Sequence, residues 1–155
     1  MQECLTIEFS ISGCKKIYYC SKNCLKQGWK SHHSKECEFL KQVSEDDLQD
    51  LEFERMVVRT IIRLQNHGDK VYDELPNGKR RYFKDLMSHK DDIENDLPTL
   101  KDFNETYSIL QSWMKNQLPS RSEVLEIYGK IKVNAHVLSD TCPFELGMNV
   151  KCCQI

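Results

Sequence analysis

The chain has 155 residues, enough for one ordinary domain or two small ones, and its 39% hydrophobic and 30% charged residues are typical of a globular protein. Apolar runs such as Met56–Val58 are far shorter than the roughly 20 residues that a membrane-spanning helix needs. The opening residues MQECLTIEF also lack a signal-peptide pattern. We therefore expect neither a membrane span nor a secretory signal.

The formal net charge is −2, but the charge is unevenly distributed. Residues 1–43 contain seven lysines and four glutamates, whereas residues 44–155 contain 15 basic and 20 acidic residues, so the two parts carry +3 and −5. Proteins that bind nucleic acid usually show a concentrated stripe of Lys and Arg. A surplus of three positive charges is too small for that pattern, so nucleic acid is an unlikely partner.

Residues 1–43 form the first predicted segment, and they contain no long apolar stripe. A segment this short cannot bury enough apolar surface to fold without a further constraint. The segment holds five of the eight cysteines: Cys4, Cys14, Cys20, Cys24 and Cys37. A disulfide framework would be one constraint. We favour metal binding instead, because no secretory signal is present and histidines are interleaved with the cysteines at helical spacing.

Zinc prefers thiolate and imidazole ligands, and donors separated by two to four residues lie on one turn of chain. Cys20 and Cys24 form one such pair, and His33 and Cys37 form another. Because a structural zinc site contributes folding free energy, it would compensate for the missing apolar core. The spacing therefore predicts a small zinc-binding domain over residues 1–43.

The remainder of the chain has the periodicity of a helical bundle. Apolar residues recur at three- and four-residue steps between Leu48 and Leu64, after a capping pair at Ser44 and Asp47 and before a stop at residues 66–68. Residues 76–78 predict a tight reversal, and further helices are expected over 82–94, 100–118 and 120–138, the last of which begins with the capping box of Ser120 and Glu123. The fold class is therefore mainly α.

The stretch YCSKNCLKQGWKSHHSKEC, from Tyr19 to Cys37, resembles the second half of a MYND zinc finger. The Tyr-Cys-Ser opening, the next cysteine, the tryptophan and the closing His and Cys all match. The resemblance implies two zinc ions in a cross-braced pattern. One ion would be held by Cys4, Cys20 and Cys24, and the other by Cys14, His33 and Cys37.

The sequence departs from the family pattern at several ligand positions. Met1 and Ile11 stand where the family has leading cysteines, so each implied site lacks one ligand. The family spacing from the preceding cysteine pair favours His32 as the histidine ligand, whereas the spacing to the last cysteine favours His33, which we prefer. A single zinc ion bound by Cys20, Cys24, His33 and Cys37 is an alternative that stays open here.

Two further stretches, DLMSH (Asp85–His89) and KIKVNAHVLSD (Lys130–Asp140), resemble parts of the SMYD proteins, lysine methyltransferases whose SET domain is split by the finger. The resemblance implies that residues 44–140 correspond to the SET insert region and that His89 and Asn134 contact S-adenosylmethionine. Other elements of that family are missing from this sequence: the Gly-containing cofactor strand, the Asn-His-Ser-Cys segment and the tyrosine of the lysine channel. Methyl transfer needs all of these aligned.

We therefore expect a zinc-binding fragment that is inactive alone as a methyltransferase. It would be cut off before the catalytic SET β-structure, with residues 141–155 as a truncated tail, and would use S-adenosylmethionine only in a full-length parent. The competing hypothesis is a stand-alone interaction module that binds a protein or peptide, either proline-rich or from a histone. Under either hypothesis we expect the protein in the nucleus, the cytoplasm or both. Tyr18, Tyr19 and Trp29 are candidates for lining its groove.

Overall fold

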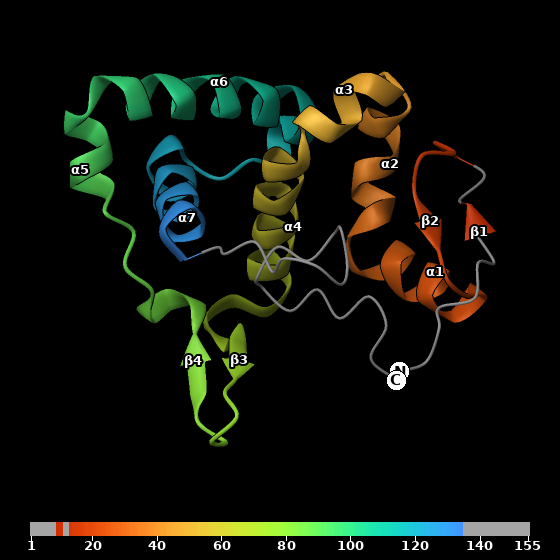
Figure 1. Cartoon of the computed structure of the whole chain (residues 1–155), viewed down its shortest axis with the longest axis horizontal. Helices are drawn as coiled ribbons and strands as arrows, with labels where there is room; N and C mark the ends of the chain where they lie inside the picture. The colour runs from red at the N-terminus through yellow and green to blue at the C-terminus, as the bar shows by residue number, and fades with distance from the viewer. Residues whose placement is uncertain (1–8, 11–12, 135–155) are drawn as a thin grey trace. The chain divides into compact units, whose positions relative to one another are not determined.

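The structure is a computed structural model that describes residues 9–10 and 13–134 (Figure 1). Cys4 and the predicted tail over residues 141–155 lie outside the described residues. The chain divides into two compact units, on either side of the bond between Phe53 and Glu54. The boundary predicted after residue 43 falls between two helices of the first unit.

The first unit begins with a short antiparallel strand pair, β1 (Phe9–Ser10) and β2 (Tyr18–Tyr19), in which Phe9 is opposite Tyr19. Three helical elements follow with no residue between them: α1 (Lys22–Gly28), a π-helical turn (Trp29–His33) and α2 (Ser34–Leu40). The Ser21 side chain caps α1 by accepting a hydrogen bond from the Cys24 backbone N–H at 3.1 Å. The unit continues with α3 (Glu45–Asp50).

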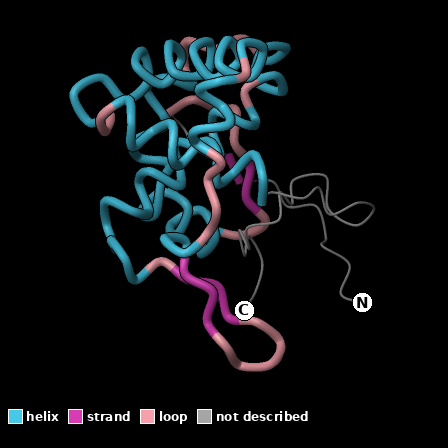
Figure 2. Tube along the Cα trace, turned by 90° about the vertical axis from the view of Figure 1, so that its left-hand side faces the viewer, coloured by secondary structure: helices cyan, strands magenta, loops and turns pink. Residues whose placement is uncertain are grey.

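The second unit is a set of helices with one hairpin, which Figure 2 shows as the strand pair projecting from the helical part. Helix α4 (Glu52–His67) starts at the boundary between the units. It is followed by β3 (Tyr72–Glu74), β4 (Arg80–Tyr82), α5 (Lys90–Asn95), α6 (Leu97–Met114) and α7 (Arg121–Asn134). Short 3₁₀ turns occupy Gly68–Lys70, Phe83–Asp85 and Lys115–Gln117.

The core of the second unit comes from the apolar faces of α4, α6 and α7. Its fully buried side chains are Val57, Val58, Ile61, Ile62, Phe103, Leu110, Val124, Leu125, Tyr128 and Ile131. Phe103 packs edge-on against Tyr128, with ring centroids 5.2 Å apart. Buried Glu54 accepts a hydrogen bond of 2.8 Å from the Thr106 hydroxyl, which joins α4 to α6.

None of the helices in the described residues combines the length and apolar character that a membrane span requires.

The mainly α fold class is confirmed, and both predicted helix caps are present. The Ser44 hydroxyl accepts from the Asp47 N–H at 3.0 Å, and Ser120 and Glu123 form the reciprocal hydrogen bonds of a capping box. The reversal at residues 76–78 is also confirmed, because it closes the β3–β4 hairpin.

Two helix predictions were wrong in part. The helix expected over 82–94 is interrupted, because Tyr82 ends β4, Phe83–Asp85 is a 3₁₀ turn, and His89 has a left-handed backbone (φ +49°) immediately before α5. A non-glycine residue in that region cannot continue a right-handed helix. The single stripe read from Leu48 to Leu64 is two helices, α3 and α4, that are separated at Leu51. Of the helix expected over 120–138, residues 135–138 lie outside the described residues.

Candidate metal centre

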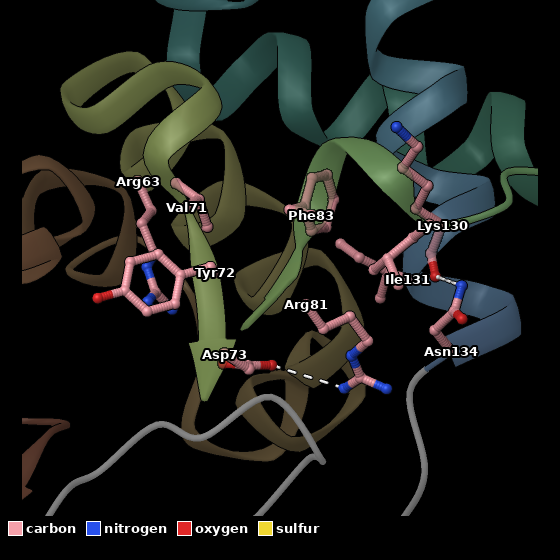
Figure 3. Close-up of a pocket in the computed structure, with 10 residues that line it drawn as sticks. Arg63, Val71, Tyr72, Asp73, Arg81, Phe83, Lys130, Ile131 and Asn134 are labelled. Atoms are coloured by element: carbon pink, nitrogen blue, oxygen red, sulfur yellow. Dashed lines mark hydrogen bonds and ion pairs between the residues drawn. The ribbon is translucent and has the colours of Figure 1, made fainter. Parts of the chain in front are cut away.

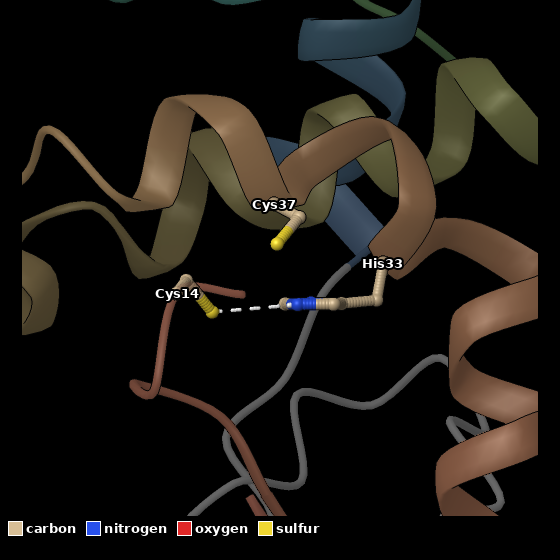
Figure 4. A group of neighbouring side chains, drawn as sticks. All are labelled: Cys14, His33 and Cys37. Atoms are coloured by element: carbon tan, nitrogen blue, oxygen red, sulfur yellow. Dashed lines mark hydrogen bonds between the residues drawn. The ribbon is translucent and has the colours of Figure 1, made fainter. Parts of the chain in front are cut away.

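Cys14, His33 and Cys37 converge in the first unit, and Figure 4 shows their side chains pointing toward one another. One ligand atom from each residue lies within 4.8 Å of the others. The Cys14 Sγ is 3.4 Å from the His33 Nε2. All three residues are buried, with 7%, 0% and 3% of their surface exposed, respectively. The cluster is therefore a group of three sulfur and nitrogen donors that is shielded from water.

Three separate elements position these side chains. Cys14 lies in the connection between the two strands, His33 is the last residue of the π-helical turn, and Cys37 lies in α2. Cys37 is four positions after His33, so both side chains project from the same side of the helical stretch. The strand connection brings Cys14 to that side, across 19 residues of sequence.

The separations agree with what zinc requires. Zinc–sulfur bonds of about 2.3 Å and zinc–nitrogen bonds of about 2.0 Å in a tetrahedral site place the donor atoms roughly 3.5–3.8 Å apart. The distance between Cys14 and His33 is within a few tenths of an ångström of this value, and the 4.8 Å limit on the cluster leaves only a small contraction. Two thiolates and one imidazole also match the preference of zinc for sulfur and nitrogen.

The π-helical turn explains why the sequence spacing did not decide whether His32 or His33 is the ligand. His33 lies one residue further from Cys24 than the family spacing, which favours His32. The backbone N–H of Ser34 donates to the Trp29 carbonyl, five residues earlier, so this turn accommodates one more residue than an α-helical turn would. His33 thereby reaches the cluster, whereas the His32 Nδ1 lies 2.7 Å from the Ser31 hydroxyl.

The electrostatics of the cluster favour a cation. Burial raises the pKa of the Cys37 thiol above its ordinary value, and the negative charge of a Cys14 thiolate raises it further. The Cys37 thiol therefore resists ionisation unless positive charge lies close to it. A divalent ion bound there would supply that charge and stabilise both thiolates.

Glu36 is a neighbour of the cluster that the sequence analysis missed. Its side chain and that of His33 are both completely buried, and the Glu36 Oε2 lies 3.8 Å from the His33 Nδ1. A glutamate in a helix with charged neighbours is usually on the solvent side. Only its position three residues after His33 could have indicated a contact.

Cys20 and Cys24 form a second sulfur pair, with the Sγ atoms 3.3 Å apart. Cys20 precedes α1 and Cys24 lies in its first turn, which the Ser21 cap holds in place. Within the described residues, the group of three donors around His33 contains neither of these sulfurs. The structure thus groups the described cysteines as Cys14 with Cys37 and Cys20 with Cys24.

The aromatic residues around the finger differ in exposure. Tyr19 is 6% exposed and packs against Gly28, where a Cβ atom would overlap its ring, so Tyr19 does not line a surface groove. Tyr18 is 54% exposed. Trp29 is 43% exposed, and its ring lies 5.8 Å from that of His33. The Trp29 ring therefore lies next to the His33 ring of the metal cluster and is also partly exposed to solvent.

The two residues predicted to contact S-adenosylmethionine, His89 and Asn134, both lie in the second unit. The His89 Nδ1 lies 2.8 Å from the Asp92 Oδ2 on the surface, and the Asn134 amide donates to the carbonyls of Met87 at 3.2 Å and Lys130 at 2.8 Å. Asn134 thus lies close in space to the segment that carries His89, and it stabilises this segment against α7.

Asn134 also lines a small cavity next to the hairpin, shown in Figure 3. The ion pair of Arg81 and Asp73, at 3.6 Å, lies at this cavity. The volume of the cavity is about 20 Å³, which is room for about one water molecule. Small-molecule sites usually have several hundred Å³, so this cavity as it stands does not accommodate a cofactor. The contacts of His89 and Asn134 with S-adenosylmethionine stay a prediction.

A comparison with models of known protein families matches residues 4–37 to the MYND finger. No solved structure matches the chain significantly. The match spans all the described residues of the two sulfur groups, including the cluster of Cys14, His33 and Cys37. The chain therefore carries a MYND-type zinc-binding finger, and fingers of this type are generally protein-interaction modules.

Proposed function

We propose that the finger is a zinc-dependent docking module for a proline-rich peptide and that Trp29 is its main contact residue. The observation that carries this proposal is the position of Trp29. Its ring lies 5.8 Å from that of His33, at a tilt of 51°, while 43% of the residue remains exposed. A ring that is supported on one side and open to solvent on the other provides a rigid apolar surface at low entropic cost.

A proline-rich peptide suits such a surface. The polyproline II helix is already extended before binding, so it loses little conformational entropy, and it docks on exposed aromatic rings. Tyr18 adds a second exposed aromatic residue. Tyr18 and Trp29 are the direct chain neighbours of Tyr19 and Gly28, which contact each other. The packing of that pair therefore anchors the backbone on which both exposed rings stand.

Zinc has a structural role in this proposal. Cys14, His33 and Cys37 would hold one ion, which would fix the His33 ring and, through it, the ring of Trp29. Cys20 and Cys24 would hold a second ion together with Cys4. The separation of the two sulfur groups supports two sites over the single site of Cys20, Cys24, His33 and Cys37.

The test is a binding titration of the whole chain with a fluorescein-labelled peptide that contains a continuous proline run, followed by fluorescence anisotropy. We expect saturable binding to the zinc-loaded protein and loss of binding after a strong chelator removes the metal. The control peptide has each proline replaced by alanine and should bind much more weakly. Equal binding of both peptides, or binding that survives metal removal, would contradict the proposal.

A further inference from the structure

The two ring nitrogens of His33 have different surroundings. The Nε2 faces the Cys14 Sγ at 3.4 Å, within the metal cluster. The Nδ1, on the opposite side of the ring, is buried and makes no hydrogen bond within the described residues. The Glu36 Oε2 lies 3.8 Å from it. A buried ring nitrogen without a hydrogen bond is costly, so this arrangement needs an explanation.

Metal binding at the Nε2 of His33 would explain the buried Nδ1. An imidazole that binds a metal through one nitrogen carries its proton on the other, and that N–H commonly donates to a carboxylate. The Glu36 oxygen needs to approach the Nδ1 by less than about 1 Å to reach the usual hydrogen-bond range of 2.7–3.2 Å.

Glu36 is placed as a partner of the histidine and not as a ligand. The donor group of Cys14, His33 and Cys37 does not contain a Glu36 oxygen. The side chain of Glu36 is completely buried, and burying a carboxylate is costly unless it is hydrogen-bonded or close to positive charge. An imidazole N–H that is polarised by a bound cation is a favourable partner of this kind.

We propose that Glu36 is a positioning residue of the metal centre, whose carboxylate accepts a hydrogen bond from the Nδ1–H of His33 and so fixes the tautomer and orientation in which Nε2 binds zinc. This inference rests on the proposed zinc site. Because the Trp29 ring packs on that of His33, Glu36 also determines how firmly the docking surface is held.

The test compares the whole chain with three variants. Glu36→Leu removes the acceptor, and Glu36→Gln keeps an acceptor oxygen while removing the charge. The matched control is Glu38→Gln, which makes the same charge change on the other side of Cys37, where the side chain is 81% exposed. Zinc affinity is measured by competition with a chromophoric chelator. The Nδ1–H proton of His33 is followed by nuclear magnetic resonance in the zinc-loaded protein.

We expect Glu36→Leu to weaken zinc binding by about 10–100-fold, the usual effect of removing an outer-shell partner. The protected Nδ1–H signal should also disappear in that variant. Glu36→Gln should restore the signal at a shifted frequency and recover part of the affinity, and Glu38→Gln should match the wild-type protein. Recovery by glutamine separates the hydrogen bond from a general packing role.

Other outcomes would overturn the proposal. If Glu36→Leu binds zinc within twofold of the Glu38→Gln control, Glu36 does not act on the metal centre. If Glu36→Leu fails to fold, the Glu36→Gln variant decides, because an Nδ1–H signal identical to that of the wild type rules out the hydrogen bond. A wild-type chain that binds no zinc would refute the proposed metal site itself, and with it this role of Glu36.

Discussion

Replacement of Trp29 by alanine tests the docking surface quantitatively. Trp29 is 43% exposed, which for a side chain of about 250 Å² leaves roughly 110 Å² free for a ligand. At about 25 cal/mol per Å² of apolar surface, full coverage contributes about 2.7 kcal/mol. At about 1.4 kcal/mol per tenfold change in affinity, this corresponds to a loss of up to about 100-fold. Since a peptide covers the ring only in part, we expect a loss of roughly 10–100-fold.

The assay is the anisotropy titration with the proline-rich peptide, performed on zinc-loaded protein. Leu97→Ala is the matched control, because Leu97 is 78% exposed but lies in the second unit. Trp29→Phe keeps an aromatic ring next to His33 and should show an intermediate affinity. The reasoning fails if Trp29→Ala retains its zinc and binds the peptide within twofold of the Leu97→Ala control.

Four further variants test the metal centre and the second unit. His33→Ala should contain about one zinc ion fewer per chain than the wild type, as measured by elemental analysis of the purified protein, whereas His32→Ala should match the wild type. Gly129→Ala should lower the free energy of unfolding in urea by about 1–3 kcal/mol, because the added Cβ would overlap the Ser88 carbonyl oxygen. Asp96 caps α6, and the hydrogen bond from the Thr99 hydroxyl lowers its pKa below the ordinary value of 3.8. Asp96→Ala should therefore reduce stability more at neutral pH than in strong acid.

The acid prediction follows from the direction of the pKa shift. A carboxyl group whose pKa is lower in the folded state stabilises the fold while it is ionised, and that contribution disappears as the pH falls through the folded pKa. A difference between Asp96→Ala and wild type that is as large in strong acid as at neutral pH would contradict this. An unchanged zinc content in His33→Ala together with a reduced content in His32→Ala would reverse the assignment of the histidine. An unchanged urea midpoint for Gly129→Ala would show that the close approach to Ser88 can relax at no cost.

Local chemistry made much of the fold predictable. The capping box of Ser120 and Glu123 and the stop at residues 66–68 involve neighbours in sequence, and each is close to its expected position. The reversal of the β3–β4 hairpin was predicted, but its strands were missed because they have three residues each, too few to show a period of two. It is stabilised by the pairing of Tyr72 with Tyr82, ten residues away, which no short window of sequence reveals.

The metal cluster shows the same limit. The spacing of His33 and Cys37 indicates a pair of ligands on one helical face, but only the fold brings Cys14 to them. The choice between the two histidines depends on a π-helical turn, which has no recognised sequence signal and moves the register by one residue. Glu36 could not be assigned from sequence, because a buried glutamate and a solvated one look alike there.

X-ray absorption spectroscopy of the natively purified chain, combined with its zinc content, tests the zinc centre most directly. We predict at least one zinc per chain, with sulfur neighbours at about 2.3 Å and nitrogen at about 2.0 Å. Less than half a zinc per chain, or a coordination shell that contains only oxygen, would contradict a metal centre built on Cys14, His33 and Cys37.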